Sequence, residues 1–364
     1  MIKEIKIQNF KCFENERVPL ANVNVLSGLN GMGKSTVLQC LLLLRQSYNP
    51  NTRQVDELYL NGRYVQLGNG QDVLYEKAET EQIGFGIKSE TGDNVFLFGY
   101  EPDSDCLTMV GDKCKDYSKE LFGKRFSYVS AYRIEPRNLY AITNEEELLQ
   151  REFGNNGEFA LQYLSLYGAE PVAVHSLLIG SEKDNTLLGQ TRLWLDRIAP
   201  GVSPQVTVNT QLRTSEVRYE FVEGTNKTNS YKSVNVGFGI TYVLPLIIAI
   251  LSAKPGELIL LENPEAHIHP AGQRMLGELI ARAGAGGVQL IVETHSDHLL
   301  NGIRLSVKHE VVPAEDVRIH FFYKDEDDGF RHKSANPEIR NDGRMDIWPK
   351  GFFDEWDKAL YELF

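Results

Sequence analysis

The sequence has few cysteines, and none of them belongs to a metal or disulfide motif. The four cysteines among the 364 residues, Cys12, Cys40, Cys106 and Cys114, form no Cys-x-x-Cys pair and have no histidine at metal-ligand spacing. This pattern is typical of reduced thiols in the cytosol. We therefore expect a cytoplasmic protein without disulfides and without a zinc site.

Long apolar runs and an excess of positive charge are also missing. The longest apolar stretch, from Val243 to Ala253, is about half as long as a membrane-spanning helix requires. The N-terminus alternates charged and apolar residues, unlike a signal peptide. With 38 basic and 50 acidic residues the net charge is -12, which disfavours a surface that binds nucleic acid everywhere. We expect a soluble protein with no membrane partner.

What the sequence does contain is an alternation of strands and helices. An apolar helix is predicted from Tyr242 to Ala253, a strand from Leu258 to Leu261, a helix from about Ala271 to Ala283 and a strand from Val288 to Val292. Such alternation predicts an α/β fold with a mixed, largely parallel sheet that helices cover.

Two segments interrupt this pattern. Between about 65 and 130, short alternating runs such as Ile83 to Ile87 and Val95 to Phe98, joined by a turn-rich segment at 89–94, predict an antiparallel β subdomain. From about 144 to 200, leucines spaced as in helices predict an α-rich insertion. We expect residues 1–364 to form a single domain that carries both.

A glycine-rich loop near the N-terminus is the strongest motif. Strands are predicted from Ile2 to Ile7 and from Val23 to Leu26, with a polar hairpin region between them, and a helix from about Ser35 to Gln46. The segment between the second strand and this helix reads Gly28-Leu29-Asn30-Gly31-Met32-Gly33-Lys34-Ser35 and has the P-loop pattern G-x-x-x-x-G-K-S.

The P-loop pattern predicts ATP binding with Mg²⁺. Its glycines let backbone N–H groups surround a phosphate, and the following helix N-terminus favours negative charge. Lys34 is expected to reach the β- and γ-phosphates and Ser35 to place its hydroxyl on Mg²⁺. The predicted nucleotide-binding residues of this loop are Gly28, Asn30, Gly31, Gly33, Lys34, Ser35 and Thr36.

Two later strands end in residues that suit phosphate chemistry. The strand Leu258 to Leu261 runs into Glu262, which predicts a carboxylate for Mg²⁺ at the sheet edge, although a buried strand can also end in a solvated glutamate. The next strand is followed by His295, which could contact the γ-phosphate or the attacking water. A single loop histidine is more often structural or solvated.

These landmarks, in this order, resemble the ABC-type ATPase heads of chromosome-maintenance and DNA-repair proteins, in particular the OLD-like branch of phage-defence ATPases. Ile5 to Phe13 is similar to the opening strand of such heads, and the resemblance places Lys11 near the adenine. Asn235-Val236-Gly237-Phe238-Gly239 resembles a variant signature loop, Glu262 to Pro270 resembles the E-x-P-E-A-H-L-H-P stretch, and Thr294-His295-Ser296 resembles the switch histidine.

The resemblance implies a homodimer in which two heads sandwich two ATP molecules. In such a dimer the signature loop presents Asn235, Gly237 and Gly239 to the nucleotide of the other subunit. Two glycines before an apolar helix suit an anion site at a helix N-terminus, although a plain turn before a core helix has the same sequence.

The sequence departs from the family in two respects. Asn263 stands where the catalytic glutamate usually follows the metal acid, so we expect slow hydrolysis, with Glu265 or His295 as alternative bases. We list Glu262, Glu265, His295 and Asn263 as candidate catalytic residues. The stretch after Pro270 is also too short for the ATPase core and a separate nuclease domain.

Two readings of function follow. The first is an ATPase that acts as a switch for a partner effector, a nuclease or a toxin encoded nearby, in phage defence. The second is an ATP-gated clamp that binds DNA through Arg133, Arg137 and Arg151; a transporter subunit fits the sequence less well. The acidic run Asp325 to Asp328 is interpreted as an exposed hairpin tip and the apolar tail Trp348 to Asp354 as docked on the head, with partner binding as an alternative.

Overall fold

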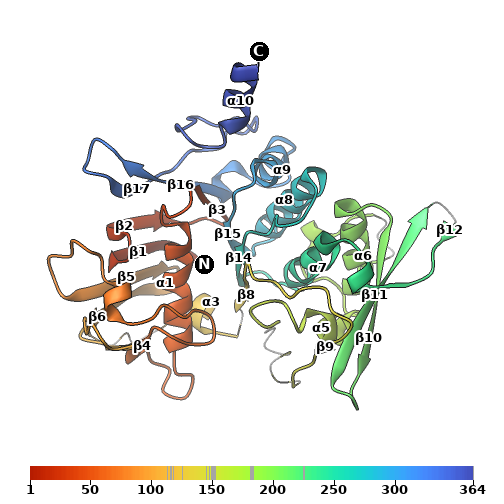
Figure 1. Ribbon diagram of the computed structural model, residues 1–364, viewed down its shortest axis with the longest axis horizontal. Coiled ribbons are helices and arrows are strands. Elements are labelled where there is room, and N and C mark those ends of the chain that lie inside the picture. Colours follow the sequence, from red (N-terminus) through yellow and green to blue (C-terminus); the bar gives the residue numbers. More distant parts are fainter. Residues whose placement is uncertain are drawn as a thin grey trace. The chain divides into compact units, whose positions relative to one another are not determined.

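The computed structural model describes residues 1–112, 114, 117, 119–124, 126–144, 146, 148, 153–180, 184–223 and 226–363. The chain forms two compact units, shown together in Figure 1. The phosphate-loop unit comprises Met1–Lys124, Arg318–Glu338 and Met345–Phe364, and the acid-loop unit comprises Arg125–Val317 and Ile339–Arg344. We describe each unit by itself.

An antiparallel sheet forms one layer of the phosphate-loop unit. Its order is β2-β1-β5-β6, with β1 at Ile2–Phe10, β2 at Phe13–Pro19, β5 at Gln82–Ser89 and β6 at Gly92–Gly99. Strand β2 lies in the region predicted as a polar hairpin, because it buries only Phe13 and Val18 and otherwise carries polar residues. Strands β5 and β6 pair as far as Ser89 and Gly92, so the connecting turn is shorter than predicted.

The P-loop stands between β3 at Val23–Gly28 and α1 at Lys34–Ser47. The predicted strand and helix are therefore confirmed, and both are almost entirely buried. Strand β3 neighbours β16 at Val317–Asp325, which pairs antiparallel with β17 at Arg331–Ala335. The smaller elements are β4 at Glu57–Tyr59, α2 at Gly70–Val73, β7 at Cys106–Thr108 and α3 at Lys119–Phe122.

Two predictions for the last part of the chain agree with this unit. Asp325 to Asp328 forms the exposed turn between β16 and β17, where Lys333 pairs with Asp325 at 2.8 Å and with Asp328 at 2.7 Å. In the tail, Phe352 is buried, and the distance between the ring centroids of Phe352 and Phe321 is 5.3 Å. The final helix, α10, spans Glu355–Leu363.

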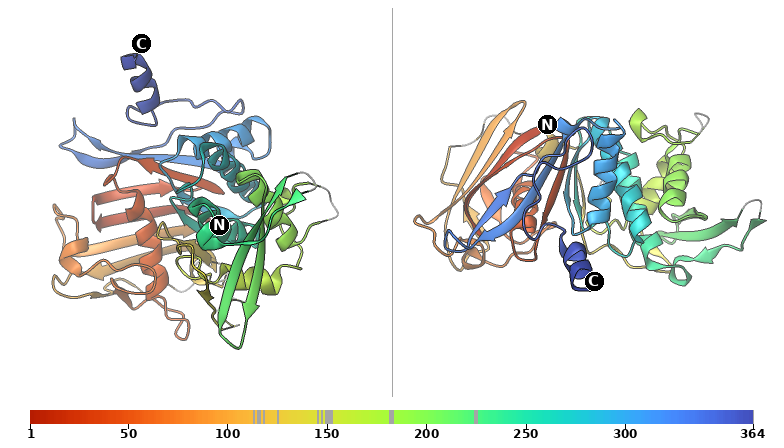
Figure 2. Two further views of the ribbon diagram at one scale, coloured as in Figure 1. Left: turned by 45° about the vertical axis from the view of Figure 1, so that its right-hand side comes forward. Right: turned by 90° about the horizontal axis from the view of Figure 1, so that it is seen from above.

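Parallel strands form the centre of the acid-loop unit. Strand β14 at Leu258–Glu262 pairs with β8 at Phe126–Val129 on one side and β15 at Gln289–Glu293 on the other. Helices α8 at Pro270–Ala285 and α9 at Asp297–Lys308 lie side by side in Figures 1 and 2. Glycines at 277 and 302 permit this close approach, since a Cβ atom on either would collide with the other helix's backbone.

The rest of the acid-loop unit combines helices with an antiparallel hairpin. Strands β10 at Val202–Asn209 and β11 at Thr214–Glu223 form the long green hairpin of Figure 1. Strands β9 at Tyr140–Ala141, β12 at Asn226–Lys227 and β13 at Tyr231–Lys232 pair with β11. The helical elements are α5 at Ala160–Tyr167, η1 at His175–Leu177, α6 at Leu187–Ile198, η2 at Ser233–Asn235, α7 at Phe238–Leu251 and η3 at Ala314–Asp316.

The elements agree with the predicted α/β class. Helix α7 begins at Phe238, four residues before the predicted start, because Gly237 is its N-cap. Of the α-rich segment, residues 145, 147, 149–152 and 181–183 lie outside the described residues, and the described part contains α5, η1 and α6. No helix within the described ranges is long and apolar enough to cross a membrane.

Candidate active site

The phosphate loop, Gly28 to Ser35, takes its shape from glycine. Gly28, Gly31 and Gly33 have φ angles of 138°, 76° and 110°, which side chains rarely adopt. A Cβ atom on Gly28 would collide with the backbone oxygen of Phe322, and one on Gly33 with the ring of Phe13. Nothing lies within 4 Å of the corresponding position on Gly31. Sterics thus require glycine at the two ends of the loop and leave its middle open.

The first residues of α1 complete this loop. Lys34 is only 4% exposed, and its Nζ atom donates to the carbonyl oxygens of Gly28 and Leu29, both at 2.9 Å. Ser35 and Asn30 are exposed, whereas Thr36 is buried with its hydroxyl 3.6 Å from the Cys12 sulfur. The loop therefore holds a cation against its own backbone at the N-terminus of a helix, where an anion is favoured.

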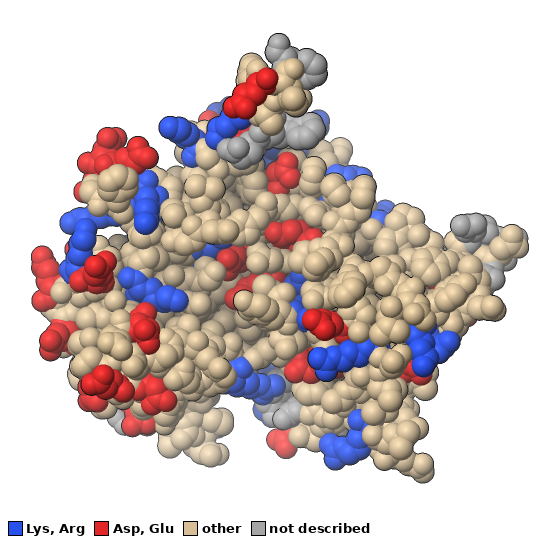
Figure 3. Space-filling view, viewed as in Figure 1, with Lys and Arg blue, Asp and Glu red and all other residues tan. Residues whose placement is uncertain are grey.

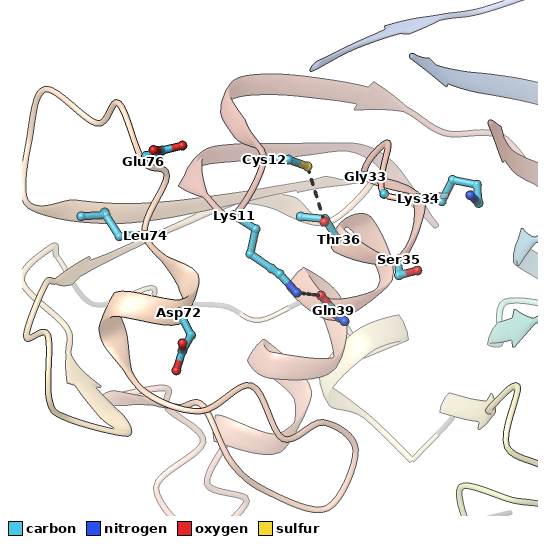
Figure 4. A pocket seen from close by; sticks show the side chains of 11 residues that line it. Lys11, Cys12, Gly33, Lys34, Ser35, Thr36, Gln39, Asp72, Leu74 and Glu76 are labelled. Carbon is cyan, nitrogen blue, oxygen red and sulfur yellow. Dashed lines mark hydrogen bonds between the residues drawn. The ribbon is translucent and has the colours of Figure 1, made fainter. Parts of the chain in front are cut away.

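A hollow of about 540 Å³ lies against the phosphate loop (Figure 4). Lys11, which the sequence predicts near the adenine, lines this hollow and donates from Nζ to the Gln39 side chain at 2.9 Å. Burial lowers the pKa of Lys11. The complete lining is Lys11, Cys12, Gly31, Gly33, Lys34, Ser35, Thr36, Gln39, Asp72, Leu74 and Glu76.

Several of these lining residues have no motif that would identify them in the sequence. Gln39 lies one helical turn after Ser35, so helical spacing places both on the same face of α1. Asp72 and Glu76 come from a distant segment, at and just beyond the short helix α2. Only folding brings them to the hollow.

In the acid-loop unit, Glu262 stands at the end of β14 and is largely buried. Its Oε2 atom accepts a hydrogen bond from the N–H of Ala131 at 3.2 Å. Burial raises the pKa of Glu262, and hydrogen bonds from Ala131 and Tyr128, together with the charge of Arg133, act in the opposite direction. The carboxyl group therefore has a structural anchor at the carboxyl end of its strand.

Asn263 follows Glu262 with a φ angle of 41°, a conformation that asparagine tolerates better than most residues. Its N–H donates to the carbonyl oxygen of Glu293 at 2.8 Å, which ties the acid loop, residues 262–269, to the end of β15. Its Oδ1 atom is buried and has no hydrogen-bond partner among the described residues.

Glu265 and His295 meet through the backbone of the histidine. Oε1 of Glu265 accepts from the His295 N–H at 2.8 Å, while Oε2 is buried without a hydrogen-bond partner within the described ranges. Burial raises the pKa of Glu265, and the His295 N–H and the Thr294 hydroxyl partly offset this. The side chain of His295 is exposed. The two oxygens of Glu265 are thus held differently, since Oε1 has a backbone partner at 2.8 Å and Oε2 does not.

The residue that sequence reasoning misassigned is Arg133. It is only 3% exposed, and its guanidinium donates to the carbonyl oxygens of Ser130 at 3.2 Å, Glu262 at 2.9 Å and Asn263 at 2.7 Å. Burial lowers the pKa of Arg133 to about 10. Arg133 therefore supports the acid loop, and its predicted role in contacting DNA is wrong because its donors are directed into the protein.

The other two predicted DNA-contacting arginines have different outcomes. Arg137 is exposed, and Arg151 lies outside the described residues. On the face shown in Figure 3, basic side chains are interspersed with acidic ones. Within each unit, the described basic side chains on this face form no continuous stripe of the kind that follows a phosphate backbone.

The two glycines of the predicted signature loop differ in their surroundings. Gly237 is exposed at the N-cap of α7, with nothing within 4 Å of the position of a Cβ atom. A Cβ atom on Gly239 would collide with the carbonyl oxygen of His267, so packing against the acid loop is sufficient to require glycine there. Asn235 is exposed at the end of η2. An open helix N-terminus thus lies beside the acid loop.

Comparison with protein families gives three matches along the chain. Residues 1–162 match an AAA ATPase domain family, and residues 165–301 match an AAA domain family whose description names an AbiEii toxin and a Type IV TA system. Residues 312–363 match a family described as a protein of unknown function (DUF3696).

Among curated proteins, the chain is 24% identical over 379 residues to an OLD nuclease of Thermus scotoductus, covering 94% of this chain and 67% of that protein. It is 27% identical over 130 residues to the DNA replication and repair protein RecF of a Thermoanaerobacter species, covering 35% of this chain and 32% of RecF. It is 25% identical over 185 residues to the DNA double-strand break repair Rad50 ATPase of Archaeoglobus fulgidus. This match covers 44% of this chain and 20% of Rad50.

Two solved structures show the fold. One is an Smc head bound to the C-terminal winged-helix domain of ScpA, with a TM-score of 0.52, 13% identity and coverage of 93% of this chain and 98% of that one. The other is an Smc head derived from Pyrococcus furiosus, with a TM-score of 0.51 and 13% identity. This match covers 100% of this chain and 99% of that one. The chain thus has the fold of Smc heads. Its sequence is similar to AAA ATPase domains over two successive segments and, more distantly, to an OLD nuclease, RecF and Rad50.

Proposed function

We propose that this ATPase binds the phosphates of ATP in the phosphate loop and hydrolyses the nucleotide slowly, as a switch. The observation that carries the proposal is the loop itself, in which glycines that sterics require surround the buried Lys34 beside a hollow large enough for a ligand. Lys11 and Gln39 lie in the same hollow and are proposed to contact the base or sugar.

The roles of the other site residues are part of the same proposal. Ser35 and Glu262 are proposed to hold Mg²⁺, which would neutralise charge on the phosphates. Glu265 is proposed as the general base, because the His295 N–H holds its Oε1 atom while its Oε2 atom has no hydrogen-bond partner among the described residues. Asn263, which cannot accept a proton at neutral pH, would only orient water, and the exposed ring of His295 would contact the γ-phosphate.

We further propose that two copies of the chain close on ATP, with the exposed Gly237 and Asn235 of one copy facing the nucleotide of the other. The open N-terminus of α7 supports this, since its backbone N–H groups can donate hydrogen bonds to an anion. The closed dimer would then regulate a partner effector in phage defence. The similarity to an OLD nuclease and to a family whose description names a toxin supports an effector of that kind.

The test is nucleotide binding and turnover by Lys34→Ala, with Lys88→Ala, an exposed lysine of the same unit, as the matched control. We expect Lys34→Ala to lose ATP affinity by about 100-fold or more, since it removes the charge that faces the phosphates. Lys88→Ala should bind as the wild type does. Normal ATP binding by Lys34→Ala, or wild-type turnover well above roughly 10 per second, would contradict the proposal.

A second function, an ATP-gated DNA clamp, draws support from the similarity to RecF and Rad50. Of the arginines first assigned to it, Arg137 is exposed and available, and Arg133 is not. The test is DNA binding at low salt, with and without ATP. Affinity that falls steeply with salt and changes with nucleotide would favour the clamp. Absence of binding at low salt would leave the effector switch as the function.

A further inference from the structure

Gln273, on the first turns of α8, connects the two loops that carry the proposed catalytic groups. Its Nε2 atom donates to the carbonyl oxygens of Glu265 at 3.4 Å and Ile268 at 2.8 Å. Its Oε1 atom accepts from the hydroxyl of Ser296 at 2.5 Å. One side chain therefore holds the backbone of the acid loop and, at the same time, the residue that follows His295.

Ser296 is itself held in place by the helix that follows it. It is the N-cap of α9, and its Oγ atom accepts from the N–H of Leu299 at 2.9 Å. Helices α8 and α9 are held together where Gly277 and Gly302 bring their backbones close. The position of the His295 N–H is thus set by a helix cap that Gln273 bonds from the neighbouring helix.

We propose that Gln273 is a positioning residue that keeps Glu265 in the orientation needed to activate water. The proposal rests on the function of Glu265 proposed above. The bond from the His295 N–H to Oε1 fixes the direction of the Glu265 carboxylate and hence of Oε2, and this bond joins the acid loop to the turn that carries His295. A shift of either loop would therefore change the orientation of Oε2. Gln273 is the side chain that bonds both loops.

The chain contains a matched control in Gln190. This buried glutamine of α6 donates to the carbonyl oxygens of Ile179 at 3.1 Å and Asp184 at 2.7 Å and accepts from the Ile179 N–H at 3.0 Å. It therefore makes the same number of hydrogen bonds as Gln273, two as donor and one as acceptor, in a different part of the unit. Replacing either glutamine by methionine keeps the length of the side chain and removes its hydrogen bonds.

The experiment compares Gln273→Met with Gln190→Met in the full chain. We expect Gln273→Met to lower kcat by about tenfold or more while KM for ATP stays within about twofold, because the phosphates are held elsewhere. Amide hydrogen exchange at His295, measured without nucleotide, should become faster in Gln273→Met alone. If Gln273→Met fails to fold, Gln273→Glu replaces it, since it keeps the acceptor for Ser296 and loses the donors.

The pH profile of kcat separates positioning from general loss of structure. The groups that act on the Glu265 carboxyl are the His295 N–H, the backbone N–H of Glu265 itself, the Thr294 hydroxyl and the charge of Arg133, and each of them lowers the pKa of Glu265. Loss of the bond from the His295 N–H should raise this pKa and move the acidic limb of the profile to higher pH in Gln273→Met only.

The outcomes are distinct. Unchanged kcat, pH limb and His295 exchange in Gln273→Met, as in Gln190→Met, would overturn the role of Gln273. If the wild type does not turn over ATP, the proposed function fails, and the exchange measurement alone then decides whether Gln273 holds the His295 turn.

Discussion

The phosphate loop and the acid loop hold their shapes by different physical means. The phosphate loop depends on the absence of side chains, since Gly28 and Gly33 touch other atoms where a Cβ would stand. The acid loop depends on polar side chains, since Arg133 and Gln273 bond its carbonyl oxygens from outside. The positions where a side chain would collide can be predicted from the glycines of a sequence motif. Hydrogen bonds from segments distant in the sequence cannot be predicted in this way.

The comparison predicts the largest effect for Gly28→Ala. The new Cβ atom would meet the backbone oxygen of Phe322, which cannot move as a side chain end could, and φ would be strained. We expect the free energy of unfolding to fall by about 3 kcal/mol, with ATP binding lost. Denaturant unfolding and nucleotide binding check this. A variant as stable as the wild type would show that β3 and β16 separate easily.

Glu265→Gln is the sharpest test of the acid loop. Glutamine can still accept from the His295 N–H, but it has no carboxylate to take a proton from water. We expect kcat to fall about 100-fold with ATP affinity unchanged. Steady-state turnover and equilibrium binding measure the two separately. Glu262→Gln is measured in the same way. If Glu262→Gln loses turnover while Glu265→Gln keeps it, Glu262 and not Glu265 is the general base.

Arg133→Met tests whether the acid loop is held by hydrogen bonds from the segment that follows β8. The variant leaves the carbonyl oxygens of Glu262 and Asn263 without their donor. We expect a loss of about 2 kcal/mol in the free energy of unfolding. Arg137→Met, on an exposed arginine nearby in sequence, is the control and should leave unfolding unchanged. Equal stability of both variants would show that the loop keeps its shape without Arg133.

The pH dependence of stability gives a smaller effect with a defined sign. Burial raises the folded-state pKa of Glu265 above its ordinary value of 4.5, so the folded state binds the proton more tightly than the unfolded state. Its contribution to stability is therefore full below pH 4.5 and is lost as pH rises through the raised pKa. Glu265→Gln should melt above the wild type by a margin that grows from pH 5 to pH 8. A margin that shrinks would mean that the carboxylate is stabilised by its partners.

Gly31→Ala should have the smallest effect and thereby sharpens the contrast within the phosphate loop. Nothing lies within 4 Å of the new Cβ atom, so the only cost is the φ angle of 76°. We expect a loss of about 1 kcal/mol in the free energy of unfolding. Thermal unfolding beside Gly28→Ala checks this. Equal losses would show that backbone conformation, rather than collision, makes glycine necessary at position 28.

The sequence by itself determined the elements whose signals are local. The strand before the phosphate loop, helix α1 and the strand–helix–strand run from Leu258 to Glu293 follow from short apolar patterns, and the structure confirms them. Strand β2 was missed because only Phe13 and Val18 of its residues face the core, so its pattern is that of a polar loop. The early start of α7 was missed because glycine stands both at its N-cap, Gly237, and in its first turn, Gly239, and because Phe238 is exposed.

Only the tertiary structure decided the surroundings of the candidate catalytic groups. Arg133 is separated by more than a hundred residues from the carbonyl oxygens of Glu262 and Asn263 that it bonds, and no periodicity links them. The bond between Glu265 and the His295 backbone depends on two parallel strands ending at one edge. The effects of glycines and apolar runs on backbone conformation are local, so they can be predicted from the sequence alone. Burial and hydrogen bonding of a carboxylate depend on segments that meet only after folding, and these decide which of its oxygens is left for chemistry.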